Sequence, residues 1–202
     1  MSSEKTDLSF LNSSVRGKMD FLVYIDGLKN VLRQTKNYSN DRRENSAEHS
    51  WHLALFVLIL GEGRGLDLFK CIKMALIHDL VEIETGDVII YDEEVRKQKE
   101  AEEAHAAEEI FAKLPEDLGS ELHQVWLEFE QNETDEAQFV KLVDRLQPLT
   151  SNYVNAGYSW EKHGISAKMV RSKHSGWQDK FEDLCHIKDE LIEQSVKRGF
   201  LP

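Results

Sequence analysis

The most informative segment of this chain is Cys71-Ile72-Lys73-Met74-Ala75-Leu76-Ile77-His78-Asp79. An apolar run of this kind, followed by polar residues, is typical of a buried helix that carries its last residues into the interior. Adjacent helical residues diverge by about 100°, so His78 and Asp79 do not share one stripe. Their tips can still converge on a metal ion placed between them.

Two further residues complete a set of metal donors. His49 lies upstream, and Asp144 lies downstream inside an apolar stripe. A buried aspartate needs a partner, which is either this metal or an arginine such as Arg145 or Arg33. Two imidazoles and two carboxylates on separate helices predict one divalent metal ion: Co, Mn, Ni, Fe, Mg or Zn. A closed structural zinc site is not expected, because it would prefer cysteines.

The composition favours one soluble helical domain. The 202 residues contain only three prolines, and few stretches alternate as strands do, so we expect an all-α fold. The net charge is -12, from 37 Asp and Glu against 25 Lys and Arg. Binding to long nucleic acid relies on an excess of cations, and we therefore exclude it.

Apolar spacing and capping residues divide the chain into helices. We expect helices over residues 18–34, from a cap at Asn45 or Ser46 to residue 60, from a cap at Asp67 to the His-Asp doublet, over residues 92–113, from Pro115 onward, from a cap at Thr134 or Asp135, and from residue 166 onward. Residues 1–202 are predicted to form one domain, with a core over about 18–160 and C-terminal helices over about 166–200.

Cysteine usage and hydropathy predict a cytoplasmic protein without membrane contact. Cys71 and Cys185 are far apart and read as reduced thiols. Residues 1–7 lack the apolar core of a signal peptide. The longest apolar stretch, residues 53–60, is too short to span a bilayer.

Four segments together resemble the HD-domain superfamily of metal-dependent phosphohydrolases, and within it the branch that contains the bacterial 5'-deoxynucleotidase. They are Glu44-Asn45-Ser46-Ala47-Glu48-His49-Ser50, Ile77-His78-Asp79-Leu80-Val81-Glu82, Thr85-Gly86-Asp87 and Lys141-Leu142-Val143-Asp144-Arg145-Leu146-Gln147-Pro148. The resemblance implies an HD-type helical bundle, and it implies these roles: metal ligands His49, His78, Asp79 and Asp144; catalytic acids Glu82 and Asp87; phosphate-binding Arg33. Gln34 stands where that branch has a tryptophan, so the base and sugar stay open.

The chemistry of these residues agrees with such roles. Glu82 lies about one helical turn beyond Asp79 and could orient water or protonate a leaving oxygen; the alternative is a solvated surface residue. Gly86 gives the backbone freedom to turn Asp87 into the site; the alternative is a helix cap. Arg33 could bind phosphate through two hydrogen bonds; the alternative is an ion pair with an exposed acid.

The remaining histidines do not favour a second metal. His52 lies one turn from His49 on the same helix face, and we expect a core or supporting histidine there. His105 and His123 lie between the doublet and Asp144, but their neighbours are not typical of metal ligands.

We therefore expect a divalent-metal-dependent phosphohydrolase acting on nucleoside 5'-monophosphates or a similar small phosphomonoester. Hydrolysis of a pyrophosphate-type or cyclic nucleotide is an alternative, and a non-catalytic nucleotide sensor is another. We also expect a homodimer, because the apolar, tryptophan-bearing helices exceed what one small bundle easily buries. The resemblance implies an oligomer too.

Overall fold

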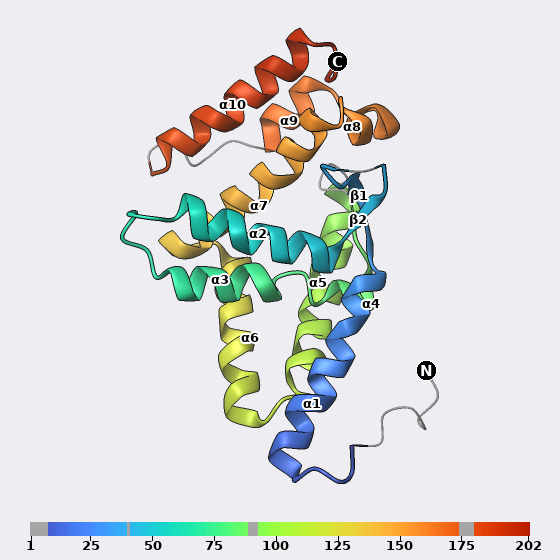
Figure 1. The fold of residues 1–202 in the computed structure, drawn as a ribbon, viewed down its shortest axis with the longest axis vertical. Helices are drawn as coiled ribbons and strands as arrows, with labels where there is room; N and C mark the ends of the chain where they lie inside the picture. Colours follow the sequence, from blue (N-terminus) through green and yellow to red (C-terminus); the bar gives the residue numbers. More distant parts are fainter. Residues whose placement is uncertain (1–7, 40, 89–92, 174–179) are drawn as a thin grey trace.

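The computed structural model describes residues 8–39, 41–88, 93–173 and 180–202, and it confirms the helical fold class. Its elements are α1 (Ser13–Ile25), the 3₁₀ helix η1 (Asp26–Asn30), β1 (Leu32–Lys36), β2 (Arg43–Asn45), α2 (Ser46–Leu60), α3 (Leu68–Ile77), α4 (Glu82–Thr85), α5 (Glu93–Phe111), α6 (Glu116–Gln131), α7 (Asp135–Val154), α8 (Tyr158–His163), α9 (Ala167–Lys173) and α10 (Glu182–Lys197). Figure 1 shows α2 and α3 side by side at the centre, α1, α5 and α6 at one end, and α8, α9 and α10 at the other.

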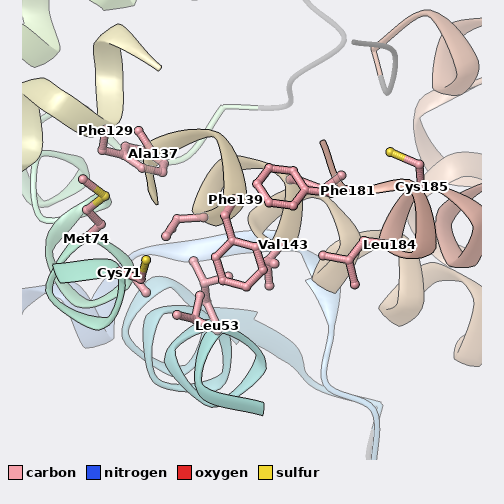
Figure 2. Packing of buried hydrophobic residues seen from close by; sticks show 14 residues of the cluster. Leu53, Cys71, Met74, Phe129, Ala137, Phe139, Val143, Phe181, Leu184 and Cys185 are labelled. Carbon is pink, nitrogen blue, oxygen red and sulfur yellow. The ribbon is translucent and has the colours of Figure 1, made fainter. Parts of the chain in front are cut away.

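The main core joins the central helices to the C-terminal region. Leu53 of α2, Met74 of α3 and Phe139 of α7 are fully buried in one cluster that also contains Phe181 and Leu184 (Figure 2). The rings of Phe139 and Phe181 lie 5.7 Å apart between centroids. The start of α10 therefore packs against α7 in this core. That residues 1–202 form one domain stays a prediction.

No helix in the described part of the chain combines the length and the apolar character needed to cross a membrane. Cys71 and Cys185 are both free and buried. The predicted cytoplasmic location is not tested by either observation and stays a prediction.

The expected capping residues set where three helices begin. Asn45 caps α2 and forms a capping box with Glu48, in which each side chain accepts a hydrogen bond from the other's backbone amide. Asp67 caps α3 and Thr134 caps α7 by accepting from the amide three residues on. The starts of α2, α3 and α7 thus agree with the prediction. The predicted start of α5 at residue 92 lies outside the described residues.

The predicted helix over residues 18–34 is wrong in its second half. α1 ends at Ile25, a 3₁₀ helix follows, and β1 then pairs antiparallel with β2. Gly27 lies in this 3₁₀ helix, where a Cβ would come within 3.3 Å of Ile83 Cγ2. Leu28 still reaches the core, so a 3₁₀ turn satisfies the apolar spacing that favoured a helix. The consequence is that Arg33 lies on a β-hairpin.

Candidate metal centre

Three segments bring the four predicted ligands together. His49 lies in the first turn of α2, His78 caps the C-terminus of α3 with Asp79 directly after it, and Asp144 lies in the middle of α7. One ligand atom each from His49, His78 and Asp79 lies within 4.8 Å of the others. Both histidines are buried. This group can hold a divalent metal ion.

The carboxylate of Asp144 faces the same point. Its Oδ1 lies 2.9 Å from His49 Nε2 and 3.6 Å from His78 Nε2. Asp79 Oδ1 lies 3.1 Å from His78 Nε2, and its Oδ2 lies 3.9 Å from His49 Nε2. Arg33, one alternative partner for Asp144, instead contacts Asp79.

The tautomers of the two histidines fit a metal site. His78 Nδ1 lies 3.0 Å from the carbonyl oxygen of Ala75, which can only accept, so Nδ1 donates and Nε2 carries the lone pair. His78 Nε2 is buried and has no well-oriented hydrogen-bond partner among the described residues. His49 Nδ1 lies 3.2 Å from Gln147 Oε1, and its Nε2 lies 2.9 Å from Asp144 Oδ1. The buried lone pair of His78 beside two carboxylates indicates a place for a cation.

The pKa shifts of His78 and Asp144 also indicate that positive charge is favoured at this place. Burial alone lowers the pKa of His78, but the charges of Asp79 and Asp144 outweigh it and raise that pKa to about 9. Burial raises the pKa of Asp144, but hydrogen bonds to His49 and His78 hold it well below its ordinary value. In the metal-free protein a proton on His78 therefore supplies positive charge. A divalent cation and this proton compete for the same lone pair.

Glu82 lies beside this centre in a buried environment. It opens the short helix α4, and the hydroxyl of Ser46 donates to its Oε2 at 2.6 Å. Burial, followed by the negative charge of Asp79, raises the pKa of Glu82 to about 8. The alternative of a solvated surface residue is therefore wrong, since Glu82 is buried.

Asp87 reaches the site through the turn that Gly86 was expected to provide. Gly86 adopts φ +73° and ψ 168°, a backbone conformation that is almost restricted to glycine. Asp87 Oδ1 lies 3.8 Å from Arg33 Nη1. The turn thus brings a second carboxylate to the edge of the metal centre.

Arg33 lies among carboxylates from three segments. Its Nη1 lies 2.7 Å from Asp79 Oδ2, and its Nε lies 3.9 Å from Glu44 Oε2. Burial lowers the pKa of Arg33, but Asp79 and Asp87 raise it overall, so the guanidinium stays charged. The side chain is 14% exposed, and within the described chain its Nε has no hydrogen-bond partner. The partners of Arg33 are therefore the part-buried Asp79 and Asp87 and the buried Glu44, and the alternative of an ion pair with an exposed acid is wrong.

A pocket of about 160 Å³ opens beside the centre. Its walls include His78, Asp79, Glu82 and Asp144, the buried Trp126 and Phe129, the cations Lys99, Lys141 and Arg145, and the acids Glu100, Glu103 and Glu130. The pocket therefore combines predicted ligands and a buried acid with charges of both signs.

The sequence interpretation gave no role in the site to Glu44, Ser46 and Gln147. All three are buried and contact a predicted site residue or its hydrogen-bond partner. Each lies inside a segment that carries the family resemblance, which is the signal that could have identified them. Their partners are distant in sequence, so spacing alone could not show the contacts.

The other histidines agree with a supporting or peripheral place. His52 Nδ1 lies 3.3 Å from Gln147 Nε2, so it supports the centre without joining the ligand cluster. The side chain of His105 is 72% exposed beside Glu109. His123 stacks on Phe111 with ring centroids 5.8 Å apart.

Comparisons with known proteins find relatives of this chain by family, sequence and structure. A family model described as an HD domain matches residues 25–184. The 5'-deoxynucleotidase HDDC2 of Homo sapiens is 32% identical over 140 residues, which cover 69% of this chain and 68% of that protein. The crystal structure of a predicted metal-dependent phosphohydrolase from Magnetospirillum magnetotacticum is 38% identical, with a TM-score of 0.86 over 94% of this chain and 96% of that one. An HD-domain phosphohydrolase from Listeria innocua is 14% identical over 89% of this chain and 90% of that one, with a TM-score of 0.63, and shares the fold.

The pKa of Glu82 predicts how stability depends on pH in the metal-free protein. Between about pH 4.5 and 8 the folded state binds a proton at Glu82 that the unfolded state has released, so stability falls as pH rises through this range. Thermal melting of chelator-treated protein across this range should show that fall, and Glu82→Gln should reduce its slope. Equal slopes in the two proteins would contradict the assignment.

Proposed function

This chain belongs to the HD domain family and is a metal-dependent phosphohydrolase, and from that premise we propose that it hydrolyses nucleoside 5'-monophosphates. The proposal rests on one observation: the donor atoms of His49, His78, Asp79 and Asp144 face one another beside the buried carboxyl of Glu82. We propose these four residues as the ligands of one divalent ion, which is Co, Mn, Ni, Fe, Mg or Zn. Glu82 and Asp87 are proposed as catalytic acids, and Arg33 as the phosphate-binding residue.

The residues have complementary parts in such a reaction. A divalent ion bound there supplies charge stabilisation at the phosphoryl oxygens and makes water more acidic. Arg33 provides two parallel N–H donors for the phosphate once a substrate competes for it with Asp79. Glu82, protonated near neutral pH in the metal-free protein, can protonate the leaving oxygen. Asp87 lies close enough to orient Arg33.

The substrate class is supported by the relatives and by the pocket. Several relatives near 30% identity are 5'-deoxynucleotidases. The pocket beside the proposed metal ligands also contains the cations Lys99, Lys141 and Arg145, which suits a phosphorylated substrate. Phosphate released from a panel of deoxy- and ribonucleotides by metal-loaded protein tests this choice. Products from cyclic or pyrophosphate-type nucleotides would favour the alternative, and no hydrolysis at all would favour a nucleotide sensor.

A first prediction separates the metal ligands from the catalytic acid. Asp79→Ala removes a charged ligand and should reduce metal content and hydrolysis together. Glu82→Ala should keep the metal and lower turnover by about 10²- to 10⁴-fold, the usual range for a positioned acid or base. Metal analysis and phosphatase rates measure both effects. Glu84→Ala, two residues away and exposed, is the matched control and should keep wild-type rates.

A second prediction concerns phosphate binding. Arg33→Ala should raise KM by about tenfold or more, because a charge-assisted hydrogen bond to phosphate is lost, and should leave metal bound. Arg42→Ala is the control, since Arg42 forms an exposed ion pair with Glu48 at the hairpin. Steady-state kinetics and metal analysis on both variants give the answer. If the two variants have the same KM, Arg33 does not bind the phosphate.

We also propose a homodimer formed through the apolar face of α2 and α3. Trp51 and Ile59 on α2 are 62% and 69% exposed, and Phe69 on α3 is 69% exposed. Large side chains grouped in this way often mark a protein interface. Light scattering should give twice the chain mass, and Ile59→Glu should give monomers. Leu22→Glu changes an exposed apolar residue of α1 and should leave the dimer intact; monomeric wild-type protein at micromolar concentration would refute the proposal.

A further inference from the structure

The two proposed histidine ligands are oriented by different groups. The Nδ1 of His78 donates to the backbone carbonyl of Ala75 in its own helix. The Nδ1 of His49 instead faces a side chain, the amide of Gln147 on α7. An amide has a donor end and an acceptor end, so the tautomer of His49 depends on which end is presented to it.

We propose that Glu44 and Gln147 are positioning residues that together set the tautomer of His49, so that its Nε2 carries the lone pair that binds the metal. This inference rests on the proposed ligand set. It assigns a purpose to two buried residues on β2 and α7 that do not themselves lie within the ligand cluster.

The orientation of the Gln147 amide follows from its neighbours. Its Nε2 lies 2.9 Å from Glu44 Oε1, and a carboxylate oxygen accepts hydrogen bonds. The same nitrogen lies 3.3 Å from His52 Nδ1, which can accept the second amide hydrogen. Both donors of Gln147 are therefore used on that side, and its oxygen is left to face His49.

The opposite orientation of the Gln147 amide would cost free energy. It would bring the amide oxygen to 2.9 Å from the Glu44 carboxylate, with two acceptors in contact inside the protein. Gln147 is fully buried, so water does not relieve such a contact. The charge of Glu44 thus selects the amide orientation, and the amide selects the hydrogen on His49 Nδ1.

Glu44 and Gln147 are themselves held by the hairpin. Thr35 donates to Glu44 Oε2 at 3.2 Å, and Arg33 Nε lies 3.9 Å from the same oxygen. Tyr38 donates its hydroxyl to the backbone carbonyl of Gln147 at 2.8 Å. A chain of contacts therefore runs from β1 and β2 through Gln147 to the metal ligand, and partners of this kind commonly tune metal affinity.

The test measures the tautomer directly. Nitrogen-15 NMR of the imidazoles in the zinc-loaded wild-type protein should show hydrogen on His49 Nδ1, with Nε2 bound to zinc. Gln147→Leu and Glu44→Gln should give a mixture of tautomers, because the fixed acceptor is lost in one and its orientation in the other. Zinc titration should show affinity weakened by about 10- to 100-fold in Gln147→Leu, the usual range for such partners.

A charge-swapped pair supplies the rescue. In the double variant Glu44→Gln/Gln147→Glu, the new amide at 44 can donate to the new carboxylate at 147, which accepts from His49 Nδ1. The double variant should recover the Nδ1 tautomer and most of the lost zinc affinity. Gln138→Leu, a glutamine of the same helix that bonds to backbone carbonyls away from the site, is the control and should change neither.

The outcomes distinguish this inference from the proposed function. A wild-type tautomer and wild-type affinity in folded Gln147→Leu would overturn it, as would failure of a folded double variant to recover either. Circular dichroism and melting identify variants that do not fold, in which case Glu44→Gln alone carries the test. If the wild-type protein binds no zinc, the proposed ligand set fails; if it binds zinc and folded Gln147→Leu binds it equally well, only this inference fails.

Discussion

Two imidazoles and two carboxylates from three helical segments lie close together inside this protein, and the positive charge that they need governs how the site is built. Nitrogen and carboxylate oxygen atoms lie 2.9–3.9 Å apart there, and carboxylates in a buried place are stable only beside hydrogen-bond donors or positive charge. A proton on His78 meets that need in one state and a metal ion in the other.

The fold holds these groups in place. The capping box at Asn45 sets the start of α2, and His49 follows one turn later. The apolar packing of α3 against α2 and α7 carries His78 and Asp79 inward. Arg33 and the hydroxyl of Ser46 then satisfy oxygen atoms of Asp79 and Glu82 that would otherwise add to the negative charge. Packing thus does the positioning, and hydrogen bonds determine which atoms face the centre.

Most of the helices and the proposed metal ligands could be predicted from the sequence, because capping residues and apolar spacing are local signals. Asn45, Asp67 and Thr134 start their helices as predicted, and His49, His78 and Asp79 form one cluster with Asp144 beside it. The hairpin was not accessible, since Arg33 enters a strand through pairing with residues farther along the chain. Gln147 was missed for a similar reason: its contact with His49 joins residues 98 positions apart, and no local pattern encodes it.

The β-hairpin has a paired base that carries site residues and an exposed tip that carries none of them. Arg33 and Glu44 lie on its paired strands, whereas Ser39, Asp41 and Arg42 lie exposed toward its tip. The pairing of Leu32 with Asn45, and the hydrogen bond from the Ser46 amide to the Val31 carbonyl, hold the base regardless of the tip. Insertions and substitutions at the tip therefore cost the metal centre little. The exposed surface of the hairpin can therefore vary while its base keeps Arg33 and Glu44 in position.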